Sequence, residues 1–156
     1  MKSGGVINRA ENSDFMKIAE LDRNSWGSDE VNRYIPDGEH VWRLWVEYSV
    51  VYCCYENKSI IGAALAFPTM DNLFVVHKIF VSPGRRGNNL GTKLFLALVD
   101  ELDNLKVDSF LTVSPDNDAA IKLYKKFGYR EERFCKGYYR ESEDRIIMLR
   151  NYSHSF

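Results

Sequence analysis

The stretch that most constrains the fold is residues 73–105, because the hydrophobic periodicity changes there across one short loop. The run "LFVVHKIFV" is rich in β-branched and aromatic residues, which predicts a strand ending at Val81. After the polar loop "SPGRRGNN", apolar residues recur at the spacing of an amphipathic helix: Leu90, Leu94, Phe95, Leu98, Val99 and Leu102. A strand, a loop and a helix in this order predict an α/β protein.

The rest of the chain extends this pattern to one domain over residues 1–156. Further strands are predicted at Val6–Arg9, "VEYSVVYCCYE", "SIIGAALAF", "SFLTVS", "YREERFCKGYY" and "DRIIMLRN". Further helices are predicted from Asp14 with Ser13 as N-cap, within "DRNSWGSDEVNRYIPDG" up to Pro36 and Gly38, and over "NDAAIKLYKKFGY" up to Gly128. This order predicts a mixed central sheet of about six to seven strands with helices on both faces.

The charge and the cysteines exclude several classes of partner. The 21 Lys and Arg residues nearly balance the 22 Asp and Glu residues, so we expect neither nucleic acid nor a membrane as a partner. No apolar run approaches the roughly 20 residues of a membrane span, and the N-terminal stretch lacks the apolar region of a signal peptide. The three cysteines cannot all pair, which favours the cytoplasm. No cluster has metal-site spacing, so no metal is expected.

The loop between the strand and the helix has the composition of an anion site. Backbone N–H groups of residues 86–91 would lack helical partners at the start of the helix. Gly87 and Gly91 would let a phosphate approach the backbone, and Asn89 tolerates a positive φ better than other residues with a side chain. The loop is neither a Walker A loop nor G-x-G-x-x-G, which argues against a nucleoside triphosphate.

Two motifs together resemble the Gcn5-related N-acetyltransferase (GNAT) family. "VSPGRRGNNLGTKL" is similar to the acetyl-CoA pyrophosphate loop Arg/Gln-x-x-Gly-x-Gly/Ala, with Arg86 first, Gly91 last and Asn89 where the family usually has glycine. "NDAAIKLYKKFGY" resembles the helix Asn-x-x-Ala-x-x-x-Tyr, with Asn117, Ala120 and Tyr124 in the matching places. The resemblance implies the GNAT fold, with an acetyl-CoA-binding core over about 72–128.

The resemblance also implies acetyl transfer from acetyl-CoA to an amine by direct attack. Tyr124 would protonate the departing thiolate, while His77, with a reference pKa near 6.5, is the candidate base or else a core histidine. Strand alternation places His77 and Lys78 on opposite faces. The expected cofactor-binding residues are Ile79, Phe80, Val81, Arg86, Gly87, Asn88, Asn89, Leu90, Gly91, Thr92 and Asn117, of which Asn117 would also serve as a helix N-cap.

The C-terminal hairpin, about residues 129–150, points to the acceptor. Its Tyr138 and Tyr139 resemble substrate-holding tyrosines of the branch that acetylates protein N-termini, and Trp26 lies where that branch has a substrate loop. An α-amine, with a pKa near 7.7–8.0, suits a site with one histidine. Two alternatives stay open: a small amine such as a polyamine, amino sugar or amino acid, with Glu141, Glu143 and Asp144 as candidate ligands, and a module that binds acetyl-CoA without turnover. The chain fits either a monomer or a homodimer.

Overall fold

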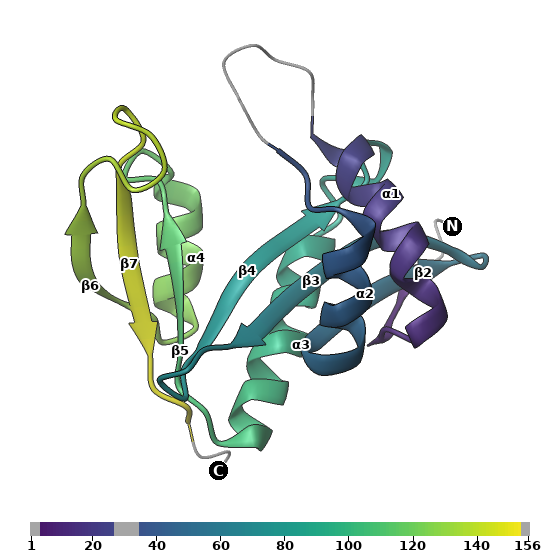
Figure 1. Cartoon of the computed structure of the whole chain (residues 1–156), viewed down its shortest axis with the longest axis horizontal. Helices are drawn as coiled ribbons and strands as arrows, with labels where there is room; N and C mark the ends of the chain where they lie inside the picture. Colours follow the sequence, from purple (N-terminus) through teal and green to yellow (C-terminus); the bar gives the residue numbers. More distant parts are fainter. Residues whose placement is uncertain (1–3, 27–34, 154–156) are drawn as a thin grey trace. The chain divides into compact units, whose positions relative to one another are not determined.

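The computed structural model describes residues 4–26 and 35–153, and Figure 1 shows their arrangement. Within these residues one mixed sheet runs in the order β1-β2-β3-β4-β5-β7-β6. Its strands are β1 (Val6–Arg9), β2 (Val50–Glu56), β3 (Ser59–Pro68), β4 (Phe74–Val81), β5 (Ser109–Val113), β6 (Arg130–Cys135) and β7 (Arg145–Arg150). The α-helices are α1 (Phe15–Ser25), α2 (Glu39–Tyr48), α3 (Leu90–Leu105) and α4 (Asp118–Lys126). The predicted fold class and order of elements are confirmed.

The pairing of β4 with β5 is parallel and short. Its register comprises Phe74 opposite Ser109 and Val75 opposite Phe110, whereas β4 continues to Val81. The pairs β1–β2, β2–β3, β5–β7 and β6–β7 are antiparallel. The later part of β4 therefore extends beyond its register with β5.

The chain forms two compact units. The first runs from the N-terminus to Phe67 and includes His77–Leu98, and the second consists of Pro68–Val76 and Val99 to the C-terminus. The core of the first unit is buried between the helices and the strands: Ile18, Ala19, Trp42, Val46, Val51, Cys53, Ala63, Leu65 and Phe80. The second unit buries its own apolar residues, among them Leu102, Leu111, Val113, Ile121, Tyr129 and Met148.

Helices lie on both sides of the sheet in the first unit, as Figure 1 shows for α1 and α2 against α3. Ala63 and Leu65 of β3 belong to the core cluster that contains Trp42 of α2. Gly62 belongs to the other face, because a Cβ built on it would lie 3.0 Å from Leu94 Cδ1 of α3. Successive strand residues point to opposite faces, so Gly62 faces α3 while Ala63 faces α2. Because glycine has no side chain, α3 can pack closely on β3 at this point.

Two local predictions about the N-terminal helices were wrong. Ser13 is not the N-cap, because a 3-10 turn spans Asn12–Asp14 and α1 follows it at Phe15. The N-cap of this turn is Glu11, whose backbone N–H donates to the Asp14 carboxylate at 3.0 Å.

The second helix also differs from its prediction. It was expected to end at Pro36 and Gly38, but α2 begins after Gly38 and includes Val46 and Tyr48, which were assigned to a strand. Trp42 and Val46 are buried four residues apart, so one face of α2 packs on the core. Much of the stretch predicted as a helix, residues 27–34, lies outside the described residues.

None of the helices within the described residues is long and apolar enough to cross a membrane. The described thiols of Cys53, Cys54 and Cys135 are free rather than paired in disulfides.

Candidate functional site

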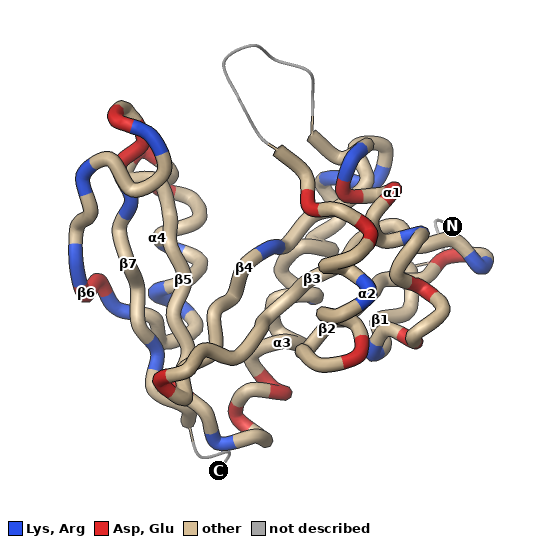
Figure 2. Tube along the Cα trace, in the orientation of Figure 1, with Lys and Arg blue, Asp and Glu red and all other residues tan. Residues whose placement is uncertain are grey.

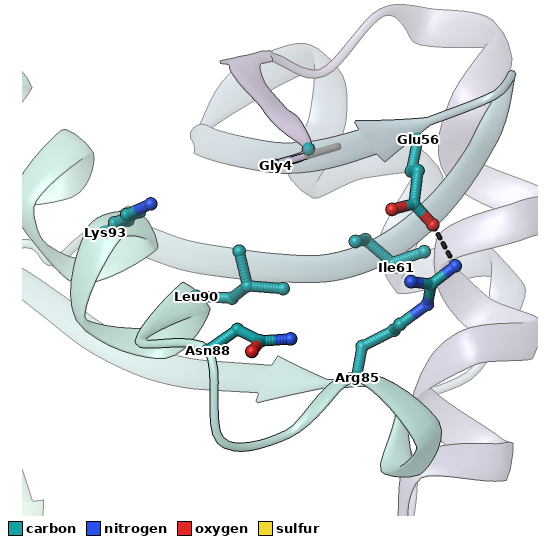
Figure 3. A pocket seen from close by; sticks show the side chains of 8 residues that line it. Gly4, Glu56, Ile61, Arg85, Asn88, Leu90 and Lys93 are labelled. Atoms are coloured by element: carbon teal, nitrogen blue, oxygen red, sulfur yellow. Dashed lines mark ion pairs between the residues drawn. The ribbon is translucent and has the colours of Figure 1, made fainter. Parts of the chain in front are cut away.

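The loop between β4 and α3, residues 82–89, is fixed to the sheet at its start. Ser82 N donates to Ile61 O at 2.8 Å, and a 3-10 turn over Pro83–Arg85 follows. The Arg85 guanidinium forms an ion pair with the mostly buried carboxylate of Glu56 on β2. Figure 3 shows this pair at a pocket of about 170 Å³, lined by Gly4, Gly5, Glu56, Ile61, Arg85, Asn88, Leu90 and Lys93. Arg85 therefore supports the loop from the side of β2.

The 82–89 loop reaches α3 through two residues with positive φ. Gly87 has φ +91° and Asn89 has φ +57°, which confirms that Asn89 adopts the conformation expected of it. Asn89 O accepts from Lys93 N at 3.0 Å, and α3 begins at Leu90. The first N–H groups of a helix have no intrahelical acceptor, so the end of the loop offers donors to an anion.

Gly87 and Gly91 leave the backbone open at this helix start. A Cβ built on either residue would meet no heavy atom of the described protein within 4 Å, neighbouring residues apart. Gly91 does not have a positive φ, so the fold itself does not require glycine there. An open backbone at a helix N-terminus fits the pyrophosphate group that the sequence predicts.

The other residues expected to bind the cofactor are placed differently. The side chains of Phe80 and Leu90 are buried, so either residue could reach a ligand only through its backbone, while Ile79 and Val81 are half-buried. Arg86 donates to Ser25 O at 2.6 Å and to Val81 O at 3.4 Å, which ties the end of α1 to the loop. Its contact with phosphate stays a prediction.

His77 lies beside a carboxylate that the sequence analysis did not find. Its Nε2 is 3.2 Å from Asp37 Oδ2, and the same oxygen is 2.5 Å from Lys78 Nζ. The imidazole packs near the rings of Trp45, at 5.4 Å, and Phe67, at 5.6 Å. His77 and Lys78 therefore share one carboxylate, although strict alternation predicts that they point to opposite faces. The carboxylate and the two rings account for this position of the imidazole.

Lys78 joins this carboxylate to a second, fully buried one. Its ammonium is 2.8 Å from Asp22 Oδ2, and the lysine side chain is only 5% exposed. Asp22 also accepts from Trp42 Nε1 at 3.1 Å, Trp26 Nε1 at 3.0 Å and Asp37 N at 3.2 Å. Burial lowers the pKa of Lys78, while the hydrogen bond and charge of Asp22 act in the opposite direction.

The sequence carried a signal for this network. Lys78 is the only charged residue of β4, as Figure 2 shows, and Asp22 follows Ile18 and Ala19 on the apolar face of α1. A charge at a core position requires a partner of opposite sign. Trp26, predicted to contact the substrate, is partly exposed, and its indole N–H is bonded to Asp22.

In the second unit, Tyr124 lies half-buried on α4. Its ring is 6.2 Å from that of Tyr129 in an edge-on arrangement. Burial raises the pKa of the Tyr124 phenol, and the charge of Arg145 offsets part of this effect. The phenol therefore keeps its proton at neutral pH and can act as a proton donor.

Asn117 begins α4 as predicted. Its Oδ1 accepts from Ala120 N at 3.2 Å, which confirms the N-cap. Its contact with the cofactor stays a prediction.

The two tyrosines expected to bind the substrate lie on a turn rather than a strand. β6 ends at Cys135, and Gly137 with φ +62° follows, so the strand predicted through Tyr139 is too long. The rings of Tyr138 and Tyr139 pack edge to face at 4.8 Å, and the Arg145 guanidinium lies 5.0 Å from the centre of the Tyr139 ring. Both tyrosines are about half exposed and therefore accessible to a ligand.

Two of the three carboxylates considered as polyamine ligands have partners within this turn. Glu143 pairs with Arg140 at 2.6 Å, and Asp144 accepts from Gly137 N at 2.9 Å. Both contacts stabilise the turn, and the Arg140 guanidinium offsets the negative charge of Glu143.

Comparison with known proteins identifies the family. A sequence model described as "Acetyltransferase (GNAT) family" matches residues 15–129. The N-alpha-acetyltransferase RimI of Mycobacterium tuberculosis is 36% identical over 69 residues, which is 44% of this chain and 42% of that protein. The [ribosomal protein bS18]-alanine N-acetyltransferase of Escherichia coli is 32% identical over 97 residues, 60% of this chain and 65% of that protein. The matches thus span less than two thirds of these relatives.

Solved structures share the fold. The crystal structure of the ribosomal-protein-S18-alanine N-acetyltransferase from Escherichia coli aligns with a TM-score of 0.79 and 24% identity, over 97% of this chain and 96% of that chain. The structure of yncA from Salmonella typhimurium with its cofactor acetyl-CoA has a TM-score of 0.78 and 19% identity, over 99% of this chain and 97% of that chain.

Proposed function

Since the chain belongs to the acetyltransferase (GNAT) family, we propose that it transfers an acetyl group from acetyl-CoA to the α-amine of a protein or peptide N-terminus. The observation that supports acetyl-CoA as the donor is the geometry of the 82–89 loop. Positive φ values at Gly87 and Asn89 lead into α3, and Gly91 leaves the backbone of the first helical turn open. These features suit a pyrophosphate.

The cofactor would be held mostly by backbone groups. N–H groups of residues 86–92 would bind the pyrophosphate, with the guanidinium of Arg86 and the amide of Asn117 as further candidates. The pantetheine arm would pair with the backbone of Ile79–Val81, the part of β4 beyond its register with β5. No metal is needed for this reaction.

The chemistry requires one base and one acid. The amine nitrogen attacks the carbonyl carbon of the thioester, and a C–N bond forms as the C–S bond breaks. His77 would take the proton that the amine loses, and Tyr124 would give its proton to the departing thiolate. A backbone N–H of Ile79–Val81 would stabilise the carbonyl oxygen as its negative charge develops.

Several observations favour an α-amine as the acceptor. The curated relatives are named as N-alpha- and ribosomal-protein alanine acetyltransferases. An α-amine has a pKa near 7.7–8.0, so a single histidine suffices as base, whereas a lysine amine near 10.4 is about 0.1% neutral at pH 7.4. Tyr138 and Tyr139 would contact the peptide, and the ion pair of Glu143 with Arg140 weakens the case for a polyamine.

We place the reaction in the cytoplasm. The free thiols of Cys53 and Cys54, both buried, are compatible with a reducing compartment, in which disulfides seldom persist.

The test is an acceptor screen with the purified protein and labelled acetyl-CoA. Peptides with free N-termini are offered beside polyamines, amino sugars and amino acids, and the products are identified by mass spectrometry. Acetylated peptide N-termini are expected. Acetylation of small amines alone would replace the proposed acceptor, and tight binding of acetyl-CoA without any product would indicate a module without turnover.

A further inference from the structure

We propose that Asp37 is a positioning residue for His77, and that Lys78 holds the Asp37 carboxylate in place. This inference rests on the proposed function, in which His77 is the base. Neither Asp37 nor Lys78 is among the catalytic residues predicted from the sequence. The geometry joins four side chains in one row: Asp22, Lys78, Asp37 and His77.

The first step is the hydrogen bond to the imidazole. With Nε2–H donating to Asp37 Oδ2 at 3.2 Å, the lone pair of the neutral ring lies on Nδ1. The rings of Trp45 and Phe67 restrict rotation of the imidazole from two neighbouring elements, α2 and β3. Asp37 therefore selects both the tautomer and the orientation of the base.

The second step is the anchoring of Asp37 itself. Its Oδ2 is 2.5 Å from Lys78 Nζ, and its backbone N–H donates to Asp22 at 3.2 Å. Asp22 is fully buried and holds Lys78 with further support from two indole N–H groups. Asp37 precedes α2 in a segment without regular secondary structure, so these side-chain and backbone contacts hold it in place.

The third step is the search for other groups that could orient the imidazole. Asp37 Oδ2 accepts from the imidazole and also binds the Lys78 ammonium. β3 carries no charged residue, and Lys78 is the only one on β4. The titratable groups of α2 are paired elsewhere or exposed: Glu39 with Arg23, Arg43 with Glu47, and His40 and Tyr48 on the surface. Among the described residues of the elements packed on His77, Asp37 is therefore the group that orients the imidazole.

The test uses two substitutions at Asp37 and reads the tautomer of the neutral His77 ring from nitrogen NMR shifts, with the His77 signals identified by their loss in His77→Gln. The native protein should carry the proton on Nε2. Asp37→Ala, which removes the acceptor, should give a mixture of both tautomers and lower kcat/KM by about 10-fold. Asp37→Asn, whose Oδ1 can still accept from Nε2–H, should keep the native tautomer and most of the activity. Circular dichroism and thermal unfolding confirm that each variant is folded.

The possible failures are distinguishable. The same tautomer in the native protein and in folded Asp37→Ala would overturn the positioning role whatever the activity. Full activity of His77→Gln would remove His77 as the base, and with it the proposed mechanism. A change of tautomer in Asp37→Ala, with no acetylated product from any acceptor, would retain the positioning role and reject the proposed function. A variant Lys78→Met that remains folded should loosen Asp37 and give the same mixture of tautomers.

Discussion

Replacement of Gly91 by alanine should make the protein more stable and a weaker binder of acetyl-CoA. Gly91 lies in the first turn of α3 without a positive φ, and its added Cβ would meet no protein atom within 4 Å. Alanine in such a helical position is favoured over glycine by about 0.5–1 kcal/mol. For a chain of 156 residues, this corresponds to an increase of about 1–4 °C in Tm.

The loss of affinity follows from the same open space. If the pyrophosphate occupies it, the new methyl group displaces the phosphate from at least one backbone N–H. A hydrogen bond to a charged group contributes about 1.5–3 kcal/mol, which corresponds to acetyl-CoA binding that is about 10- to 100-fold weaker. Gly91→Leu should abolish binding without unfolding the protein.

Thermal unfolding without ligand and titration calorimetry with acetyl-CoA measure the two effects separately. Gly84→Ala is the matched control, because Gly84 lies in the same loop, its Cβ would also meet no protein atom, and it precedes the predicted phosphate-binding residues. A more stable Gly91→Ala protein with unchanged affinity would refute the anion site. A less stable one would refute the helical conformation assigned to Gly91.

Three further outcomes are expected. Tyr124→Phe should lower kcat about 100-fold with little change in the Kd of acetyl-CoA, and an unchanged rate would remove it as the acid. Asn89→Gly should preserve cofactor binding because φ is +57°, whereas Asn89→Val should cost about 1–2 kcal/mol of stability. Burial alone would raise the pKa of Asp103, but hydrogen bonds from Arg150 and Ser153 hold it below its usual value. The resulting stability is present above about pH 4 and is lost as the pH falls through the lowered pKa. Asp103→Asn should therefore lower the free energy of unfolding by about 3 kcal/mol at pH 7. Urea titrations at several pH values should show a weaker dependence on acid pH for this variant.

The parts of the fold that the sequence predicted are those with strong local signals. The strand that ends at Val81, the loop and the helix from Leu90 combine a change of period with glycines and asparagine at the turn. The positive φ of Asn89 agrees with the expected tolerance of asparagine for this conformation. In these segments, local preference and the final structure agree.

The predictions were wrong or incomplete where tertiary contacts determine the conformation of a segment or the partner of a side chain. Val46 and Tyr48 precede a run of β-forming residues, which predicts a strand. They belong to α2 instead, because a helix buries Trp42 and Val46 against the same core. Asp37 is 40 residues from His77, and nothing periodic links the two positions. A lysine in an apolar strand requires an acidic partner, so the sequence predicts that Lys78 pairs with an aspartate or a glutamate. It does not indicate which one.

The row of charged residues beside His77 is better explained by its placement of Asp37 at the imidazole than by a contribution to the stability of the fold. A buried ion pair contributes little net free energy, because desolvation offsets most of the attraction, and apolar residues of similar size often stabilise a protein as well. Asp22 and Lys78 are 0% and 5% exposed, so their pairing carries this cost in full. What apolar residues could not do is hold Asp37 at the imidazole. Arg86 also donates to Ser25 O, one turn beyond Asp22, so the same end of α1 contacts both the 82–89 loop and the charged network beside His77.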